Sequence, residues 1–183
     1  AGKTTTVRII TGVLKADKGE ALVMGHKAGT LKAKQISGVV PEMANAYEDL
    51  SGWKNMALMG EIYGVPKNAI KARSDELLKK VNLYSRKDKA VRTYSKGMKQ
   101  RLILCMALIS DPEILFLDEP TNGVDPISRR DFWAILYRLV AEGLTVVVTT
   151  AYLDEAERCS RVGLMHQGRM ILCDKPARLI QKY

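Results

Sequence analysis

The stretch Ile114-Leu115-Phe116-Leu117-Asp118-Glu119 decides the fold. Its four consecutive apolar residues predict a strand that is buried on both faces, as in the middle of a parallel sheet. Helical and strand-like segments alternate around it, which favours an α/β fold with right-handed crossovers. Helices are expected at residues 3–12, 48–63, 68–81, 97–110, 127–142 and 153–159, and further strands at 21–24, 36–40, 144–149, 164–166 and 170–172.

Length and composition limit what the chain can be. Its 183 residues suffice for one domain with a sizeable core. Hydrophobic residues make up 46% and charged residues 27%, which is typical of a folded chain. The apolar runs are far shorter than the about 20 residues of a transmembrane helix. Segment 43–97 is helical in pattern and interrupts the alternation, so we expect a core of 1–42 and 98–183 with an inserted helical subdomain.

The start of the chain and its cysteines bear on its context. Ala1-Gly2-Lys3 is neither a start methionine nor a signal peptide, so we expect the chain to begin within a longer protein. The three cysteines form no CxxC motif or Cys/His cluster. This favours a reducing cytoplasm over a disulfide framework or a zinc site.

The net charge of +9 is concentrated in one segment. Residues 67–101 contain 12 Lys and Arg residues against 3 acids, and the remainder is balanced at 17 of each sign. One interpretation is a solvated helical face, which is what charge runs usually form. The other is a surface that meets phosphate, whether of a nucleotide, a lipid headgroup or RNA.

Gly2-Lys3-Thr4-Thr5, at the start of an expected helix, matches the end of a phosphate-binding loop, G-x-x-x-x-G-K-[ST]. Glycine lets the backbone approach phosphate, and the N–H groups of a helix N-terminus donate hydrogen bonds to it. Lys3 would reach the β- and γ-phosphates, and the Thr4 hydroxyl would bind Mg²⁺. These four residues alone are a weak signal because so short a motif recurs by chance.

The two acids after the central strand strengthen that interpretation. Asp118 at the strand end would hold Mg²⁺ through a water molecule, and Glu119 would polarise the attacking water as the catalytic residue. The alternative is a buried strand that ends in helix-capping acids. With Gly2-Lys3-Thr4 upstream, the nucleotide site is the favoured interpretation.

Two further motifs carry a resemblance to a known family. Residues 94–101 (YSKGMKQR) resemble the signature motif of ABC-type ATPases, and 119–126 (EPTNGVDP) resemble their D-loop. The order of the phosphate loop, signature, acidic strand end and D-loop is specific to that family, and the resemblance covers essentially the whole chain. It implies a P-loop fold that binds ATP and Mg²⁺.

The resemblance also implies a second ATPase domain as partner. Two ATP molecules would lie at a head-to-tail dimer interface, each between one domain's phosphate loop and the other's signature. Ser95 and Gly97 would face the γ-phosphate of the partner's ATP, where the start of a helix favours an anion. Ser95 is equally suited to a simple helix cap. Asp125 would contact the opposite site.

The groups of ABC proteins that the sequence resembles indicate the function to expect. The D-loop, Phe132-Trp133 and the segment 152–159 are similar to ATPase subunits of drug or polysaccharide exporters, and to tandem ATPases, some of which associate with ribosomes. We therefore expect an ATPase at the cytoplasmic face of a membrane that drives a permease partner. The basic segment 67–101 would contact anionic lipid or, in the alternative, a ribosome.

Two positions depart from the family pattern. Glu42 stands where glutamine is usual, and a carboxylate there still suits Mg²⁺. Ala151 stands where a histidine usually contacts the γ-phosphate. Since a methyl group donates no hydrogen bond, and one lost donor costs about 100- to 1000-fold in rate, this site is expected to hydrolyse ATP slowly. The chain would then be one half of an asymmetric pair or a nucleotide-gated clamp.

Overall fold

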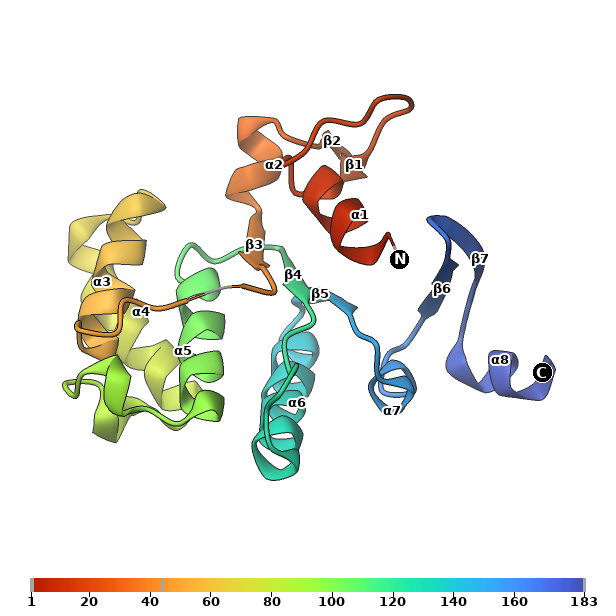
Figure 1. Cartoon of the computed structure of the whole chain (residues 1–183). Helices are drawn as coiled ribbons and strands as arrows, with labels where there is room; N and C mark the ends of the chain where they lie inside the picture. Colours follow the sequence, from red (N-terminus) through yellow and green to blue (C-terminus); the bar gives the residue numbers. More distant parts are fainter. Residues whose placement is uncertain (1, 44, 183) are drawn as a thin grey trace.

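A computed structural model describes residues 2–43 and 45–182. Its centre is a parallel sheet of three strands in the order β3 (Ser37–Val40), β4 (Ile114–Asp118), β5 (Thr145–Thr149) (Figure 1). All five residues of β4 are buried. The predicted α/β fold with a central strand buried on both faces is thus confirmed.

The residues of β4 alternate between two hydrophobic clusters. Ile114 and Phe116 belong to the cluster with Val7 of α1 (Lys3–Ile10) and Ala33 of α2 (Leu31–Gln35). Leu115 and Leu117 belong to the cluster built by α5 (Lys96–Leu108) and α6 (Pro126–Ala141). Because successive side chains of a strand point to opposite faces, helices cover both sides of the sheet.

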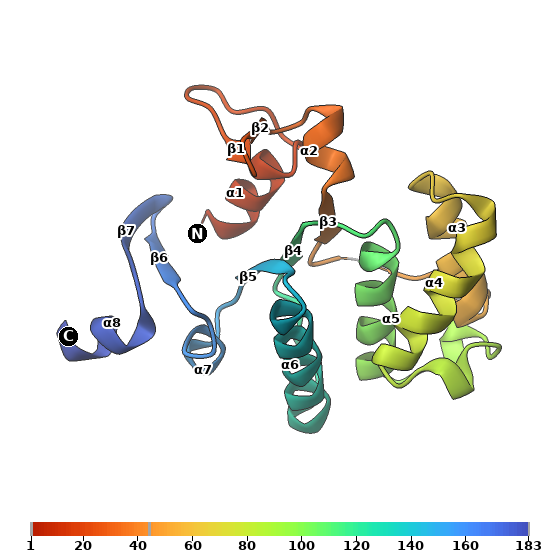
Figure 2. The same ribbon diagram turned by 180° about the vertical axis from the view of Figure 1, so that it is seen from behind.

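The segment before α5 is helical and packs away from the sheet. It contains α3 (Gly52–Ile62), α4 (Lys67–Lys80) and two short 3₁₀ helices, η1 (Tyr84–Arg86) and η2 (Val91–Thr93). The helices α3 and α4 pack on each other and on α5, and Figure 2 shows them on the far side of α5 from the sheet. The division into a core and a subdomain of residues 43–97 stays a prediction that these contacts support.

Beyond β5 the chain forms α7 (Leu153–Ala156), the hairpin β6 (Val162–His166) and β7 (Arg169–Asp174), and α8 (Pro176–Lys182). The predicted hairpin is confirmed. The helix expected at 153–159 ends early because the N–H groups of Arg158 and Cys159 bond to carbonyls three residues back.

Several short elements were not foreseen in the sequence. The expected strand 21–24 is instead a small hairpin of β1 (Leu22–Val23) and β2 (His26–Lys27). Its two connecting residues, Met24 and Gly25, have φ of 48° and 83°, as in a type I′ turn. Helices α2 and α8 were also missed, and the helix expected from residue 48 begins at Gly52 because Ser51 caps it. None of these differences changes the sheet.

Gly38 in β3 allows α5 to approach the sheet. A Cβ at this position would lie 2.6 Å from the Ala107 carbonyl oxygen and 2.9 Å from Leu115 Cδ1. We therefore expect Gly38→Ala to destabilise the protein by about 1–3 kcal/mol, because the core has to shift. Urea unfolding followed by circular dichroism would measure the loss.

The matched control is Gly163→Ala in β6. There the added methyl group would meet only the end of the Met170 side chain, at 3.0 Å, which is flexible and exposed. Equal destabilisation by the two variants would contradict the packing explanation.

Candidate active site

A cavity of about 280 Å³ lies at the carboxyl end of the central sheet. This edge of a parallel sheet is the usual place for a ligand in an open α/β fold. The N-terminus of α1 and the segments that follow β3, β4 and β5 meet there. Its lining residues are Gly2, Lys3, Thr4, Thr5, Glu42, Glu119, Asn122, Ala151 and Tyr152.

The N-terminus of α1 forms the part of the cavity that suits a phosphate group. Gly2 precedes the helix with a φ of 105°, a conformation that favours glycine. The first backbone N–H groups of a helix have no partner within the helix, and here no side chain caps them either. Together with the helix dipole, these groups favour an anion at Lys3, Thr4 and Thr5.

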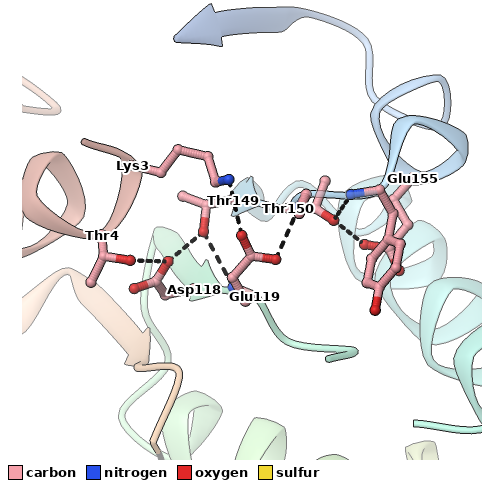
Figure 3. Close-up of polar contacts among 9 residues, drawn as sticks. Lys3, Thr4, Asp118, Glu119, Thr149, Thr150 and Glu155 are labelled. Carbon is pink, nitrogen blue, oxygen red and sulfur yellow. Dashed lines mark hydrogen bonds and ion pairs between the residues drawn. The ribbon is translucent and has the colours of Figure 1, made fainter. Parts of the chain in front are cut away.

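Asp118 at the end of β4 faces Thr4. The Thr4 hydroxyl donates a hydrogen bond to Asp118 Oδ1 at 3.3 Å, and the Thr149 hydroxyl donates to the same oxygen (Figure 3). Two oxygens that bind one octahedral Mg²⁺ side by side stand about 3 Å apart, since each lies about 2.1 Å from the ion. The Thr4 and Asp118 oxygens therefore fit a magnesium site.

Few protein ligands are needed for such a site. Among residues 2–43 and 45–182, no group of three or more His, Cys, Asp or Glu side chains could hold a metal. Mg²⁺ at phosphate sites usually takes one or two protein ligands and fills its shell with water and phosphate oxygens. Glu42 lines the cavity, and its role as a further ligand stays a prediction.

Glu119 is held at both carboxylate oxygens. Lys3 Nζ lies 3.1 Å from Oε1, and the backbone N–H of Ala151 donates to Oε2 at 3.0 Å. Figure 3 shows this carboxylate between Lys3 and the end of β5. The φ of Glu119 is 49°, a left-handed conformation that is rare for such a residue and common at functional sites. The surrounding contacts hold it there.

The other predicted site residues lie at the starts of α5 and α6. Ser95 Oγ accepts a hydrogen bond from the Met98 N–H at 3.2 Å and caps α5. Asp125 Oδ1 accepts one from the Ser128 N–H at 2.9 Å and caps α6, and this bond lowers the pKa of Asp125 below its usual value. A Cβ on Gly97 would lie 2.5 Å from the Ser128 hydroxyl, so the two helix starts are close together.

Ser95, Gly97 and Asp125 are not among the residues that line the 280 Å³ cavity. A second cavity of about 400 Å³ extends from the site toward the start of α5. It shares Glu42, Glu119 and Asn122 with the first cavity. Within one chain, the start of α5 is therefore a neighbour of the site rather than a part of it.

Sequence reasoning missed Thr149 and Asn122. Thr149 contacts both acids, since its hydroxyl donates to Asp118 and accepts from the Glu119 N–H at 3.2 Å. Its place at the end of a strand next to β4 was the available signal, because parallel strands end at the same edge. Asn122 lies in the turn after Glu119 and donates its N–H to the Glu119 carbonyl at 3.1 Å.

Comparisons with known proteins identify the family. The family model described as "ABC transporter" matches residues 1–122. The chain belongs to the ABC transporter family. It is 38% identical over 178 residues to the probable multidrug ABC transporter ATP-binding protein YbhF of Escherichia coli (strain K12). The matched segment covers 96% of this chain and 31% of that protein.

Two other ABC proteins extend the comparison. The Nod factor export ATP-binding protein I of Rhizobium sp. (strain N33) is 37% identical over 186 residues, 100% of this chain and 61% of its own length. The solved structure of cbiO1 from Clostridium perfringens, part of the ABC transporter complex cbiONQ, matches with a TM-score of 0.84 at 25% identity. That match covers 100% of this chain and 77% of the cbiO1 chain.

The curated relatives are longer than this chain, which spans about a third of one and three fifths of the other. They agree with the expected resemblance to exporter ATPases. In the part of the ABC domain that the structure describes, no helix has both the length and the apolar character needed to cross a membrane.

Acidic side chains neutralise part of the positive charge of segment 67–101 in this ABC domain. Six of its 12 Lys and Arg side chains form ion pairs, which are Lys71 and Lys87 with Asp75, Arg73 with Asp111, Lys80 with Glu76 and Glu142, Arg92 with Asp49, and Lys99 with Glu48. Four of these acids lie outside residues 67–101: Glu48 and Asp49 precede α3, Asp111 follows α5, and Glu142 follows α6. The pairs favour the interpretation as a solvated helical face.

Thr149→Val tests whether the Thr149 hydroxyl orients Asp118 for magnesium binding. Since the Thr149 hydroxyl orients Asp118, its loss is expected to weaken magnesium-dependent ATP binding about 10-fold or more, as losing an outer-shell partner commonly does. A magnesium titration of the binding of a fluorescent ATP analogue would measure the shift.

Thr145→Val is the matched control, because Thr145 is the exposed first residue of the same strand. Its side chain makes no hydrogen bond within the described part of the chain. If both variants showed the same magnesium dependence, Thr149 would have no part in orienting Asp118.

Proposed function

We propose that this chain is an ATP-hydrolysing domain that powers export through a membrane permease partner. The observation that supports this most is the meeting of Lys3 and Thr4 of α1 with Asp118 and Glu119 at the end of β4. These groups come from positions more than 100 residues apart, and together they match the needs of phosphoryl transfer. The family of the chain agrees with this chemistry.

Each residue has a distinct role in this proposal. The N–H groups at the start of α1 and the Lys3 ammonium bind the phosphates of ATP and stabilise the charge that develops during transfer. Thr4 and Asp118, with Glu42 as a further candidate, hold Mg²⁺, which when bound neutralises charge on the β- and γ-phosphates. Glu119 orients the water that attacks the γ-phosphate and accepts its proton.

The ion pair between Lys3 and Glu119 implies an exchange of partners when ATP binds. At 3.1 Å the ammonium neutralises the carboxylate, although the Lys3 side chain is 35% exposed. A polyphosphate at the start of α1 carries more negative charge and attracts the ammonium more strongly. Nucleotide binding would thereby release one oxygen of Glu119 to the water.

The site requires a second ATPase domain to be complete. Ser95 and Gly97 at the start of α5 would bind the γ-phosphate held by that partner domain, and Asp125 would contact the opposite site. Their places outside the 280 Å³ cavity are compatible with this arrangement. The partner is either a second copy of the domain or a different one, including one in the same polypeptide.

The named relatives support export and a membrane location. Their printed names include a probable multidrug transporter and a Nod factor exporter. By analogy, the domain would work at the cytoplasmic face of the membrane, bound to a permease. Contact of the basic segment 67–101 with anionic lipid or a ribosome has less support, because half of its cations already pair with acids.

A second function is favoured by one observation. Ala151 lines the cavity beside Lys3 and Glu119, and its methyl group offers no hydrogen bond to a γ-phosphate. A domain that binds ATP but hydrolyses it slowly would serve as a nucleotide-gated clamp or as the slow half of an asymmetric pair. The intact Glu119 argues for a working ATPase.

Glu119→Gln tests the main proposal. The amide keeps the size of the side chain but accepts no proton, so we expect at least a 100-fold loss of MgATP turnover with ATP binding retained. Steady-state phosphate release and equilibrium binding of a fluorescent ATP analogue would be measured on the full-length protein. A wild type that binds no ATP, or a variant that turns over at the wild-type rate, would contradict the proposal.

Ala151→His distinguishes the two functions. If the histidine restores a donor to the γ-phosphate, turnover rises by about 10-fold or more. The wild-type site would then hydrolyse ATP slowly because it lacks that donor. If the wild type already turns over quickly and the histidine adds nothing, the clamp is excluded. The same phosphate-release assay gives both answers, with Ala156→His in α7 as a control for the substitution itself.

A further inference from the structure

Glu155 of α7 is a buried carboxylate that the proposed reaction does not use. Its side chain is completely buried, and it does not line the nucleotide cavity. Burying an acid without partners is costly, so its contacts have to compensate. These contacts are with Thr121, Thr150 and Arg129, and each of the two threonines flanks a different part of the active site.

The first contact reaches the turn that carries Glu119. The Thr121 hydroxyl donates to Glu155 Oε1, and Thr121 is itself 1% exposed. Thr121 lies two residues after Glu119, inside the turn closed by the Asn122 N–H on the Glu119 carbonyl at 3.1 Å. Through the Thr121 side chain, Glu155 therefore contacts the turn in which Glu119 has its left-handed conformation.

The second contact reaches the turn that binds the Glu119 side chain. The Thr150 hydroxyl donates to Glu155 Oε2 at 2.6 Å and accepts from the Tyr152 N–H at 3.0 Å. Residue 151 lies between them, and its N–H donates to Glu119 Oε2 at 3.0 Å. Figure 3 shows the series from Glu155 through Thr150 to the side of Glu119.

Arg129 of α6 compensates the buried charge. Its Nε lies 3.8 Å from Glu155 Oε1, and its guanidinium stacks on the Tyr152 ring with 4.4 Å between the guanidinium carbon and the ring centroid. The arginine therefore contacts both the carboxylate and the turn after β5. A buried, paired charge that joins two loops is expected to restrict their relative movement.

We propose that Glu155 is a positioning residue for the hydrolysis reaction. Its two carboxylate oxygens bind the segments on either side of Glu119, one through Thr121 and one through Thr150, so that the Ala151 N–H meets the Glu119 carboxylate. Because that donor belongs to the backbone, it holds Glu119 whatever side chain stands at position 151. The proposal rests on the function proposed above, since it concerns the orientation of Glu119.

A glutamine at position 155 cannot do the same work. Its amide has one acceptor oxygen, so one of the two threonine hydroxyls would face an NH₂ group instead. A threonine hydroxyl can accept from that NH₂ group, but the amide carries no charge, so the contacts with both segments weaken. The Arg129 guanidinium also loses its ion pair, while the cavity lining keeps its composition.

The test is Glu155→Gln in the full-length protein. We expect the turnover number for MgATP to fall by about 10- to 100-fold, because small misplacements of a catalytic group have such effects. The affinity for a fluorescent ATP analogue should change less than about threefold, since Lys3 and Thr4 are untouched. Glu157→Gln, an exposed acid two residues on, is the matched control and should keep both values.

A double variant separates positioning from a merely structural role. If Glu155 acts through Glu119, adding Glu155→Gln to Glu119→Gln should cost no further activity, as for residues that work as a unit. A further loss similar to that in the single variant would overturn the proposal. The concentration of ATP-binding sites, titrated in each sample, corrects for unfolded protein.

Thr150 provides a second test should Glu155→Gln fail to fold. Thr150→Val removes the hydroxyl and keeps the shape, so its turnover should fall like that of Glu155→Gln. Thr150→Ser keeps the hydroxyl and should recover most of that loss. If Thr150→Val or Glu155→Gln turns over at the wild-type rate, Glu155 does not position Glu119. A wild type that neither binds nor hydrolyses ATP would instead refute the proposed function.

Discussion

The parallel pairing of β4 with β3 and β5 is the constraint on which the rest of the structure depends. Leu117 pairs with Val40 on one side and Asp118 with Thr149 on the other. Because parallel strands end at the same edge, this register brings the residues after all three strands to one place. The alternation of β4 between two hydrophobic clusters fixes the register, since a shift by one residue would turn its side chains to the wrong faces.

That edge is where local strain and charge are concentrated. Glu119 has a left-handed backbone conformation, and its carboxylate lies between an ammonium and a backbone N–H. Such an arrangement persists only when neighbouring contacts hold it. Here the neighbours are Thr149 beside the acids and Glu155 behind them. In the proposal above, the buried carboxylate would hold Glu119, the proposed catalytic acid, in place although position 151 carries an alanine.

Much of the central sheet and of the candidate site could be predicted from the sequence. The continuous apolar run of β4 predicts a buried strand, and the acids after it predict an edge with carboxylates. The short motif at Gly2 is weak by itself, and it predicts a phosphate-binding helix start only together with the acids that follow β4. The hairpin β1–β2 was missed because two-residue strands leave almost no pattern, and α2 because its five residues show less than two helical turns.

The sequence by itself determined the order of the longer helices and strands, the motifs and the family, since these depend on local pattern and on residue types at fixed spacing. Only the tertiary structure decided which side chains meet across long separations. The contacts of Thr149 with Asp118 and of Glu155 with Thr121 join residues more than 30 positions apart. No periodicity encodes them, because they arise where separate strands and helices pack together. For the same reason, pairing of half the basic segment with acids became visible only in the fold.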